Sequence, residues 1–289
     1  MKIALGSVQF GLKYGVSNLS GPTSKSQIKK ILEIAKNSGV DTIDTATAYG
    51  NSEVLLGYSN VKKFKVITKI PTLKPNTTNI EKWVSNKIYS SIKKLKIESL
   101  YGVLIHNSKN FSGDKGRVLL ETLQSLKKKG IIKKVGISIY DPSELNYIKN
   151  LSNLDLVQAP MNLIDRRLER SGWLNKLHKK RIEIHARSIF LQGLLLIKPN
   201  KIPKKFEKWK VILNQWHYQL EKKKMNALEA CLSYPLSLAE VDKIIVGVNN
   251  IRQFREIIIA YQNNFKFKGW SFMISNDQQL INPSNWSNF

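Results

Sequence analysis

The segments IALGSV at 3–8, SKSQIKKILEIAKNSG at 24–39 and VDTID at 40–44 form the unit that decides the fold. The first and third segments are short and apolar, as expected of buried strands. In the middle segment apolar residues recur at spacings of three and four, which indicates an amphipathic helix. Ser24 is a favoured helix N-cap, and Gly39 is a favoured residue just past a helix end. The unit is therefore predicted to be a strand, a helix and a second strand, from which parallel sheets are built.

The same alternation continues to the end of the chain. Strands are predicted at 3–8, 40–44, 64–69, 100–105, 133–137, 154–158, 181–186 and 243–246. Helices are predicted at 24–38, 52–58, 80–95, 117–129, 142–150, 172–180, 206–223, 227–234 and 251–261. Eight such units favour an α/β fold in which a parallel sheet closes into a (β/α)8 TIM barrel. The main competitor is an open doubly wound sheet, but the turn at 6–11 lacks the G-x-G-x-x-G spacing typical of that fold.

The 289 residues are predicted to form one domain, because barrels routinely reach that length as a single unit. Residues 266–289 are polar and aromatic, and we expect them to lie over the surface as a C-terminal tail. The sequence shows no signal-peptide apolar segment and no apolar run near the roughly 20 residues of a membrane span. Cys231 is the only cysteine, which fits a reducing compartment. We therefore expect a cytoplasmic protein.

The chain carries a formal net charge of +26. Such an excess can indicate binding to nucleic acid or to an anionic membrane. However, only eight of the 47 basic residues are arginine, and the lysines are spread along the chain. Specific nucleic-acid sites favour arginine forks and local clusters. We therefore expect no specific nucleic-acid partner, and the charge is compatible with an anionic small-molecule substrate.

Four polar residues lie where the predicted second, third and fourth strands end. Asp44 ends the second strand and Tyr49 follows it, while Lys69 ends the third strand. His106 follows the fourth strand. In a barrel these strand ends meet at one face, where active sites are found. The four residues are therefore predicted to form an acid–base set without a nucleophile, and no metal site is predicted, because the other histidines lack ligand spacing.

Each residue of this set has a distinct predicted role. A tyrosine has a reference pKa of about 10, and a nearby Lys69 ammonium is expected to lower the pKa of Tyr49. Asp44 is expected to pair with Lys69 and so offset the cost of burying its charge. His106 is expected to hydrogen-bond the substrate oxygen. Such a set would protonate a carbonyl oxygen as hydride reaches the carbonyl carbon, or would catalyse the reverse reaction.

The chain resembles the aldo-keto reductase superfamily in order and spacing over nearly its whole length. The segments that carry the resemblance are DTIDTATAYGNSE at 41–53, ITKI at 67–70, LIHN at 104–107, GIS at 136–138, QAPMNLID at 158–165, HARSIFLQGLL at 185–195 and IIVGVNN at 244–250. The resemblance implies a (β/α)8 barrel, NADPH as the usual cofactor, and reduction of an aldehyde or ketone. It places the family's catalytic tetrad on Asp44, Tyr49, Lys69 and His106.

The resemblance also implies a nicotinamide cofactor site. Contacts to the nicotinamide amide are expected from Ser138 and Gln158, with Asn162 nearby. The full set expected at the cofactor is Ser138, Gln158, Arg187, Ser188, Gly247, Asn249, Arg252 and Glu256. No basic residue directly follows the glycine of the eighth strand end, so the 2′-phosphate of NADPH would depend on Arg252 or Lys243. NADH is therefore possible as well.

The chain departs from the family pattern at several positions. The β-hairpin usual ahead of the first strand is absent, which is expected to leave the barrel bottom less covered. The usual serine–asparagine pair is Ser138–Ile139, and the usual glutamate–asparagine pair near the adenine is Glu256–Ile257. Where the family has an aromatic residue stacked on the nicotinamide, Arg187 is expected to bind an anionic group of cofactor or substrate. The alternative is an ion pair of Arg187 with Asp165 or Glu169.

The sequence leaves the substrate and the biological role open. The loops after the fourth and seventh predicted strands look short, which predicts a shallow, open, basic pocket suited to a sugar or nucleotide-linked sugar. Similar chains are often associated with surface-polysaccharide synthesis, so the resemblance implies that setting. The alternatives are a cofactor-binding regulatory or redox-sensing barrel without strong turnover, and a basic surface that binds nucleic acid. The intact acid–base set favours an enzyme, and we expect a monomer or weak dimer.

Overall fold

The computed structural model describes residues 1–18, 20–106, 113–148, 151–263 and 270–288. Its strands form a closed parallel barrel in sequence order, in which β8 pairs with β1. The strands are β1 (Ile3–Gly6), β2 (Thr42–Asp44), β3 (Lys65–Ile70), β4 (Leu100–Ile105), β5 (Ile132–Ser138), β6 (Leu156–Pro160), β7 (Glu183–Arg187) and β8 (Lys243–Gly247). The predicted α/β TIM barrel is confirmed.

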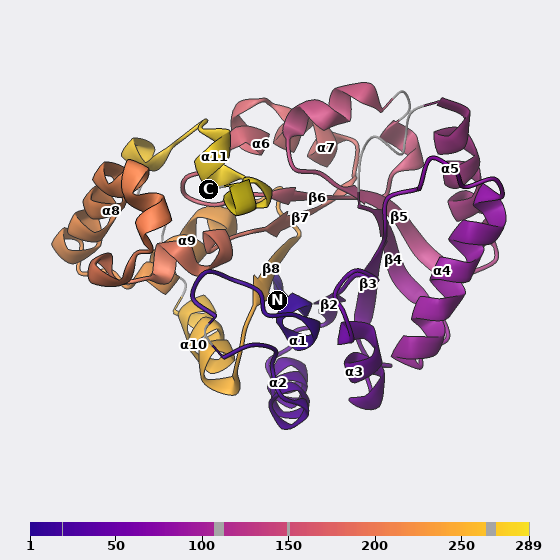
Figure 1. The fold of residues 1–289 in the computed structure, drawn as a ribbon, viewed down its shortest axis with the longest axis horizontal. Coiled ribbons are helices and arrows are strands. Elements are labelled where there is room, and N and C mark those ends of the chain that lie inside the picture. Colours follow the sequence, from indigo (N-terminus) through magenta and orange to yellow (C-terminus); the bar gives the residue numbers. More distant parts are fainter. Residues whose placement is uncertain (19, 107–112, 149–150, 264–269, 289) are drawn as a thin grey trace.

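Helices surround the barrel (Figure 1). The α-helices are α1 (Val8–Gly11), α2 (Lys25–Asn37), α3 (Ser52–Tyr58), α4 (Ile80–Leu95), α5 (Gly113–Lys128), α6 (Arg167–Arg170), α7 (Trp173–Lys179), α8 (Lys210–Lys222), α9 (Ala227–Ser237), α10 (Ile251–Gln262) and α11 (Gln278–Ile281). The 3-10 helices are η2 (Pro142–Tyr147), η3 (Leu151–Asn153), η4 (Leu191–Leu196), η5 (Pro199–Lys201), η6 (Lys204–Trp209), η7 (Ser271–Met273) and η8 (Pro283–Asn288). Helix α8 lies outermost, beyond α9 (Figure 1). Within the described ranges, no helix is both long and apolar enough to cross a bilayer.

The buried core has two parts. Most buried apolar side chains lie between the barrel and the surrounding helices. A separate cluster of Ile67, Leu104 and Leu156 fills the barrel interior, with Tyr101 packed against it. A barrel interior filled in this way is a packed core and not a pore. The two ends of the barrel are therefore separate chemical environments.

Local sequence signals begin several helices as predicted. Ser24 accepts a hydrogen bond from the backbone N–H of Gln27 at the start of α2. Gly39 follows that helix with a φ of +78°, a left-handed conformation that suits glycine. Asp141 caps the helix predicted at 142–150, and Pro142 occupies its first turn. That helix is a 3-10 helix that ends at Tyr147. The predicted end at 150 lies outside the described residues.

Two predicted elements and one predicted loop length are wrong. Strand β1 ends at Gly6, and Val8 begins α1 where a strand was predicted. The helix predicted at 206–223 is divided into η6 and α8. The loop after β7 is long, because 188–209 holds η4, η5 and η6 before α8 begins. Three of its non-glycine residues, Ser188, Leu191 and Gln192, have positive φ angles, a conformation that their residue types do not signal.

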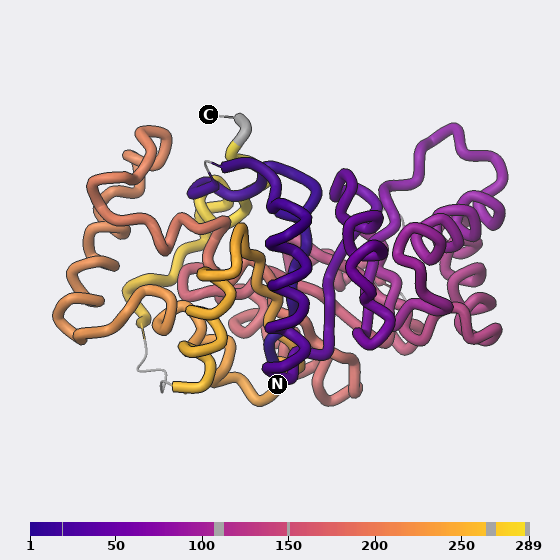
Figure 2. The backbone as a smooth tube through the Cα atoms, turned by 90° about the horizontal axis from the view of Figure 1, so that it is seen from below, coloured from indigo at the N-terminus to yellow at the C-terminus, as the bar shows by residue number. Residues whose placement is uncertain are grey.

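The C-terminal segment differs from the predicted surface tail. The fully buried side chains in its described part are Trp270, Met273, Leu280 and Ile281. Trp270 packs against Trp216 of α8, with ring centroids 5.0 Å apart. In Figure 2 the N-terminus lies at the bottom of the molecule, and the yellow C-terminal segment reaches the top. Large aromatic side chains give this otherwise polar segment enough apolar area to pack against the barrel.

The N-terminal face of the barrel holds a cluster of polar and charged side chains. Glu183 at the start of β7 accepts hydrogen bonds from Tyr101 and Lys134. The ring nitrogen Nε2 of His185 lies 3.0 Å from Oε1 of the same carboxylate. Burial favours the neutral acid, but the hydrogen bonds from His185 and Lys134 outweigh it and lower the pKa of Glu183 to about 2. The charged carboxylate therefore stabilises this end of the fold.

Replacing Glu183 with glutamine is expected to lower the free energy of unfolding by about 2 kcal/mol at pH 7. A depressed carboxyl pKa gives stability that is present above about pH 4.5 and is lost as pH falls toward 2. The difference between variant and wild type should therefore shrink by more than half near pH 3, as measured by urea denaturation. Glu207→Gln, which removes an exposed pair with Lys210, is the matched control. A difference that stays constant with pH would contradict this role of Glu183.

Candidate active site

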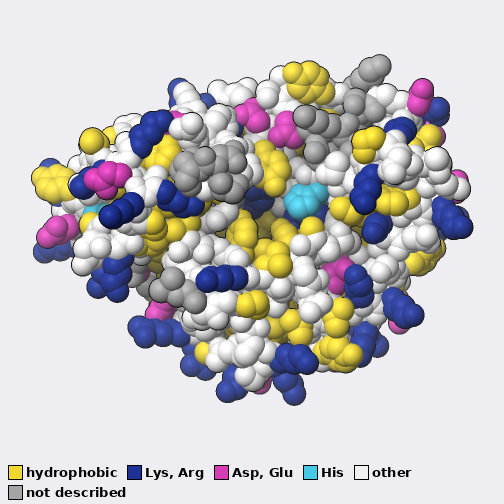
Figure 3. All heavy atoms as spheres, in the orientation of Figure 1, with side chains coloured by type: hydrophobic (Ala, Val, Ile, Leu, Met, Phe, Trp, Pro, Cys, Tyr) yellow, Lys and Arg dark blue, Asp and Glu magenta, His cyan; other side chains and the backbone are white. Residues whose placement is uncertain are grey.

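A cavity of about 970 Å³ opens where the strands end. Its walls come from segments after β1, β2, β5, β7 and β8, and the C-terminal segment adds Pro283 and Ser284. Figure 3 shows the hollow near the centre of this face, bordered by hydrophobic, basic and histidine side chains. The short loop predicted after the seventh strand is wrong, because the long loop there contributes residues from 188 to 196 to the cavity wall. The volume is at the upper end for small-molecule and cofactor sites.

The four residues of the predicted acid–base set all line this cavity. Lys69 is buried, and its Nζ lies 2.7 and 2.6 Å from the two carboxylate oxygens of Asp44. The same Nζ donates to the carbonyl of Thr45 at 3.0 Å and to the Tyr49 hydroxyl at 3.4 Å. His106 borders the same cavity from the end of β4. The predicted grouping of these side chains is therefore present.

Burial sets the protonation states of this group. Burial raises the pKa of Tyr49 well above its usual value, and the carboxylate of Asp44 raises it further. The predicted lowering by Lys69 is wrong, because Asp44 already balances the ammonium charge. Burial lowers the pKa of Lys69, and Asp44 opposes that change. Burial also lowers the pKa of His106 to about 4, with Lys69 and Arg187 adding to the effect. At neutral pH the site thus holds a protonated phenol and a neutral imidazole.

Two glycines let the loop of Tyr49 lie directly against α1. A Cβ on Gly11 would lie 1.8 Å from the carbonyl oxygen of Tyr49, and a Cβ on Gly50 would lie 2.6 Å from that of Gly11. Both N–H and Oγ1 of Thr47 donate to the carbonyl of Lys69, at 3.1 and 3.0 Å. These contacts tie the loop after β2 to α1 and to β3. They fix the phenol beside the ammonium.

Ser138 and Gln158 extend the polar network from the neighbouring strands. Ser138 Oγ donates to Gln158 Oε1 at 3.2 Å, and Gln158 Nε2 donates to Asp44 Oδ1 at 2.8 Å. Both residues line the cavity, as predicted for contacts to a nicotinamide amide. Asn162 does not line it. Its Nδ2 donates to the carbonyl of Ser188 at 3.0 Å and its oxygen accepts two backbone N–H groups, so it shapes the loop.

Of the other residues predicted to bind the cofactor, some line the cavity and some do not. Those that line the cavity are Arg187, Ser188, Gly247, Asn249 and Glu256. Arg252 does not line it, since its side chain is 87% exposed and pairs with Glu256 at 2.9 Å. Lys243, the other candidate for a 2′-phosphate, begins β8 at the opposite end of the barrel and pairs with Asp41 at 2.5 Å. A phosphate contact from Lys243 is therefore excluded.

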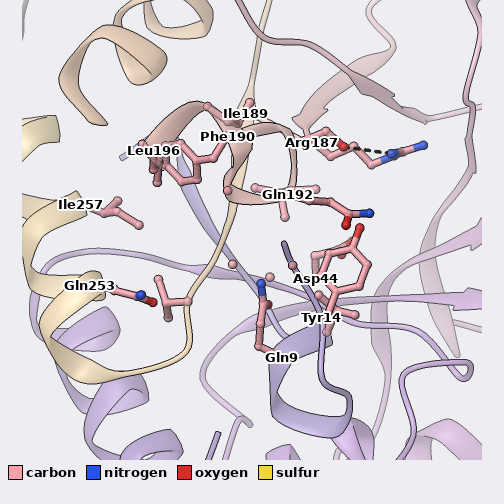
Figure 4. Close-up of a pocket in the computed structure, with 18 of the residues that line it drawn as sticks. Gln9, Tyr14, Asp44, Arg187, Ile189, Phe190, Gln192, Leu196, Gln253 and Ile257 are labelled. Atoms are coloured by element: carbon pink, nitrogen blue, oxygen red, sulfur yellow. Dashed lines mark hydrogen bonds between the residues drawn. The ribbon is translucent and has the colours of Figure 1, made fainter. Parts of the chain in front are cut away.

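Polar atoms without partners lie on the cavity wall near the end of β8. Among the described residues, Gln9 Oε1 and Asn249 Oδ1 are buried and have no hydrogen-bond partner. A Cβ on Gly247 would lie 2.5 Å from the Gln9 amide, so glycine leaves room for that side chain, which extends into the cavity (Figure 4). Buried amide oxygens are normally paired, and these two require donors. The ribose hydroxyls and amino groups of a nicotinamide dinucleotide supply such donors, so the residues present fit that cofactor.

The predicted set lacks several polar side chains of the wall, among them Tyr14, Tyr140 and Gln192. The Tyr14 hydroxyl and the Gln192 amide are hydrogen-bonded, and Figure 4 shows their polar ends close together. The backbone N–H of Val16 donates to the carbonyl of Gln192 at 2.9 Å, which joins the two loops. Tyr14, Tyr140 and Gln192 come from three segments far apart in the sequence, and the folded chain brings them to one wall.

Arg187 ends β7 beside these residues. Its Nη2 donates to the carbonyl of Ile139 at 2.9 Å, and its Nη1 donates to Ser188 Oγ at 3.2 Å. The guanidinium carbon lies 4.6 Å from the ring centroid of Tyr140, an arrangement typical of a cation–π contact. The guanidinium is therefore held in one position on the cavity wall.

The alternative surface ion pair of Arg187 is wrong. Asp165 pairs with Arg167 at 2.8 Å. Glu169 accepts a hydrogen bond from the Tyr234 hydroxyl at 2.8 Å. Within the part of the chain that the structure describes, no aspartate or glutamate forms an ion pair with Arg187. No carboxylate among the described residues thus balances its charge.

Comparison with known proteins identifies relatives along the chain. The model of the Aldo/keto reductase family matches residues 2–272. "Uncharacterized oxidoreductase YqkF" of Bacillus subtilis (strain 168) is 26% identical over 266 residues, covering 85% of this chain and 86% of that protein. D-arabinose 1-dehydrogenase of Saccharomyces cerevisiae is 27% identical over 153 residues, covering 47% of this chain and 46% of that protein.

Solved structures share the fold. The aldo-keto reductase AKR11C1 from Bacillus halodurans, in its holo form, has a TM-score of 0.73 at 17% identity, with 93% of this chain and 94% of that chain covered. The glycerol dehydrogenase AKR11B4 from Gluconobacter oxydans has a TM-score of 0.69 at 21% identity, with 93% and 87% covered. The family match extends over nearly all of the sequence, from β1 to η7. The chain belongs to the aldo/keto reductase family and is an oxidoreductase.

Proposed function

We propose that this protein reduces an aldehyde or ketone with NADPH or NADH, and that Tyr49 donates the proton. The observation that carries the proposal is the position of the Tyr49 hydroxyl, 3.4 Å from the Nζ of buried Lys69 on the wall of a cavity of about 970 Å³. A donor with a raised pKa keeps its proton until the carbonyl oxygen gains negative charge. The proposed chemistry needs no covalent intermediate with the protein.

Each side chain of the site has a separate role in the proposed reaction. When bound, the reduced nicotinamide supplies hydride to the carbonyl carbon, and Gln9 and Asn249 would help to hold the dinucleotide. Tyr49 passes its proton to the carbonyl oxygen. Lys69 then stabilises the phenolate that remains, because its ammonium lies 3.4 Å away. His106 is a neutral imidazole at working pH and can donate an N–H to the same carbonyl oxygen.

The choice between the two nucleotides would depend on one ion pair. Arg252 is the remaining candidate for the 2′-phosphate of NADPH, and it pairs with Glu256, which lines the cavity. Binding NADPH would exchange that carboxylate for the phosphate. With NADH, Glu256 could accept a hydrogen bond from the free ribose hydroxyl, as acidic residues do in other dinucleotide sites. We propose NADPH as the usual cofactor on the basis of family resemblance, with NADH also accepted.

The substrate proposed is a sugar or a nucleotide-linked sugar. Tyr14, Tyr140, Gln192 and Arg187 give the cavity wall hydrogen-bonding groups where an apolar aldehyde would need apolar ones. Two relatives have names that refer to polyhydroxylated compounds, D-arabinose 1-dehydrogenase and glycerol dehydrogenase. The proposed setting is the synthesis of a surface polysaccharide in the cytoplasm, by a monomer or weak dimer.

Tyr49→Phe is expected to lower kcat about 10²- to 10⁴-fold, because the general acid is lost. The dissociation constant of NADPH should stay within about threefold of wild type, since a single hydroxyl facing the substrate is removed. Turnover is followed by NADPH absorbance and binding by nucleotide fluorescence. Tyr58→Phe is the control, because Tyr58 is 69% exposed and does not line the cavity. Half of wild-type activity in the Tyr49 variant would remove that residue from the mechanism.

The rate of reduction is expected to be nearly independent of pH from about 6 to 9. His106 has a pKa of about 4, so it remains neutral above that value. The pKa of Tyr49 is raised, so its proton is lost only above the usual range of a tyrosine. A profile of kcat against pH in the direction of reduction tests this, in buffers matched for ionic strength. An ionisation near pH 6.5 that disappears in His106→Asn would show that the imidazole titrates normally.

A further inference from the structure

Arg187 is a cation on the cavity wall with no carboxylate partner among the described residues. We propose that Arg187 binds an anionic group of the carbonyl substrate, a carboxylate or a phosphate. This inference rests on the proposed function and narrows its substrate class. The substrate would be an aldehyde or ketone, such as a sugar acid or a sugar phosphate, that carries its own negative charge.

The guanidinium of Arg187 is preorganised to bind such an anionic group. Arginine has five N–H donors in a planar fork, and two of those of Arg187 are used by Ile139 and Ser188. The contact with the Tyr140 ring restrains the plane of the group. Ser188, the next residue, has a φ of +60°, an uncommon conformation that is often found at functional sites. A cation that is already oriented loses little further freedom when it binds an anion.

The described carboxylates of the cavity wall do not pair with Arg187. Asp44 is balanced by Lys69 at 2.6 Å. Glu229 and Glu256 also line the cavity, but neither forms an ion pair with Arg187. A partly enclosed cation attracts an anion more strongly than an exposed one, because less water screens the interaction. Among the described residues, no carboxylate lies within ion-pair distance of Arg187, and a charged substrate would supply one.

The position of Arg187 favours the substrate over the cofactor as the source of that charge. Its field reaches the reacting groups, since it opposes the effect of burial on the pKa of Tyr49 and adds to the effect of burial on that of His106. The orphaned amides that fit the dinucleotide lie elsewhere, on Gln9 after β1 and on Asn249 after β8. A group held by Arg187 would therefore lie beside the carbonyl that Tyr49 protonates.

The test compares substrates that differ only in charge. Wild-type protein and Arg187→Met are assayed with glucuronate against glucuronamide, with 4-carboxybenzaldehyde against its methyl ester, and with glyceraldehyde 3-phosphate against glyceraldehyde. The ratio of kcat/KM for the charged member over the neutral member is expected to fall about ten- to a hundredfold in Arg187→Met. The ratio for Arg187→Lys should lie between those of wild type and Arg187→Met, because lysine keeps the charge and loses the planar fork of donors. The first two pairs report a carboxylate and the third a phosphate.

Arg170→Met is the matched control, because it removes the same charge from an exposed residue of α6 that does not line the main cavity. Its charged-to-neutral ratio should equal that of wild type. A second readout is the shift in melting temperature that a non-reducible carboxylate, benzoate, causes in the presence of NADPH, which Arg187→Met should abolish. Circular dichroism of the variant shows whether it is folded.

The outcomes separate this inference from the proposed function. If wild type reduces none of the compounds, neutral or charged, with either nucleotide, the proposed function fails. If it reduces them but Arg187→Met leaves all three ratios unchanged, Arg187 has no role in substrate recognition and the inference alone is overturned. A loss of NADPH affinity of tenfold or more with unchanged ratios would assign Arg187 to the cofactor and would also overturn it.

Discussion

The buried ion pair between Lys69 and Asp44 is the constraint on which the rest of the site depends. An ammonium inside a barrel costs several kcal/mol unless its protons are all satisfied. The parallel register of β2 and β3, which pairs Asp44 with Ile67, brings the carboxylate within 2.6 Å of the lysine two residues further along. The ammonium also donates hydrogen bonds to the carbonyl of Thr45 and to the hydroxyl of Tyr49. The charge pair thus fixes the position of the proton donor while it satisfies its own burial.

The sequence was sufficient to predict the barrel and the acid–base set, because both follow from one geometric rule. Alternating strands and helices close into a barrel, and the ends of parallel strands share one face. Asp44, Lys69 and His106 could therefore be grouped without any knowledge of loops. The protonation state could not be predicted in the same way. The pKa of Tyr49 depends on how much water the packed loop excludes, and that depends on Gly11 and Gly50, which approach each other from segments far apart in the sequence.

The features that escaped prediction share a physical cause. Tyr14 and Gln192 meet because two irregular loops pack together, and Gln192 has a positive φ that its residue type does not signal. Trp270 is buried because it packs against Trp216 of α8, which is far from it in the sequence. Periodicity reports which face of a regular element is buried. It carries no information on where an irregular segment crosses the barrel, so the substrate side of the pocket is the least predictable part of this fold.

The diffuse positive charge of the chain is consistent with a site for anionic ligands. A net charge of +26 produces a long-range field that attracts anions, including a dinucleotide phosphate, without a local patch. At physiological ionic strength this field is screened beyond about 8 Å, so it raises the rate of encounter more than the final affinity. Selection among anions must then come from groups held in fixed positions inside the cavity. Arg187, restrained by Tyr140 and by the carbonyl of Ile139, is such a group, whereas the exposed lysines are not.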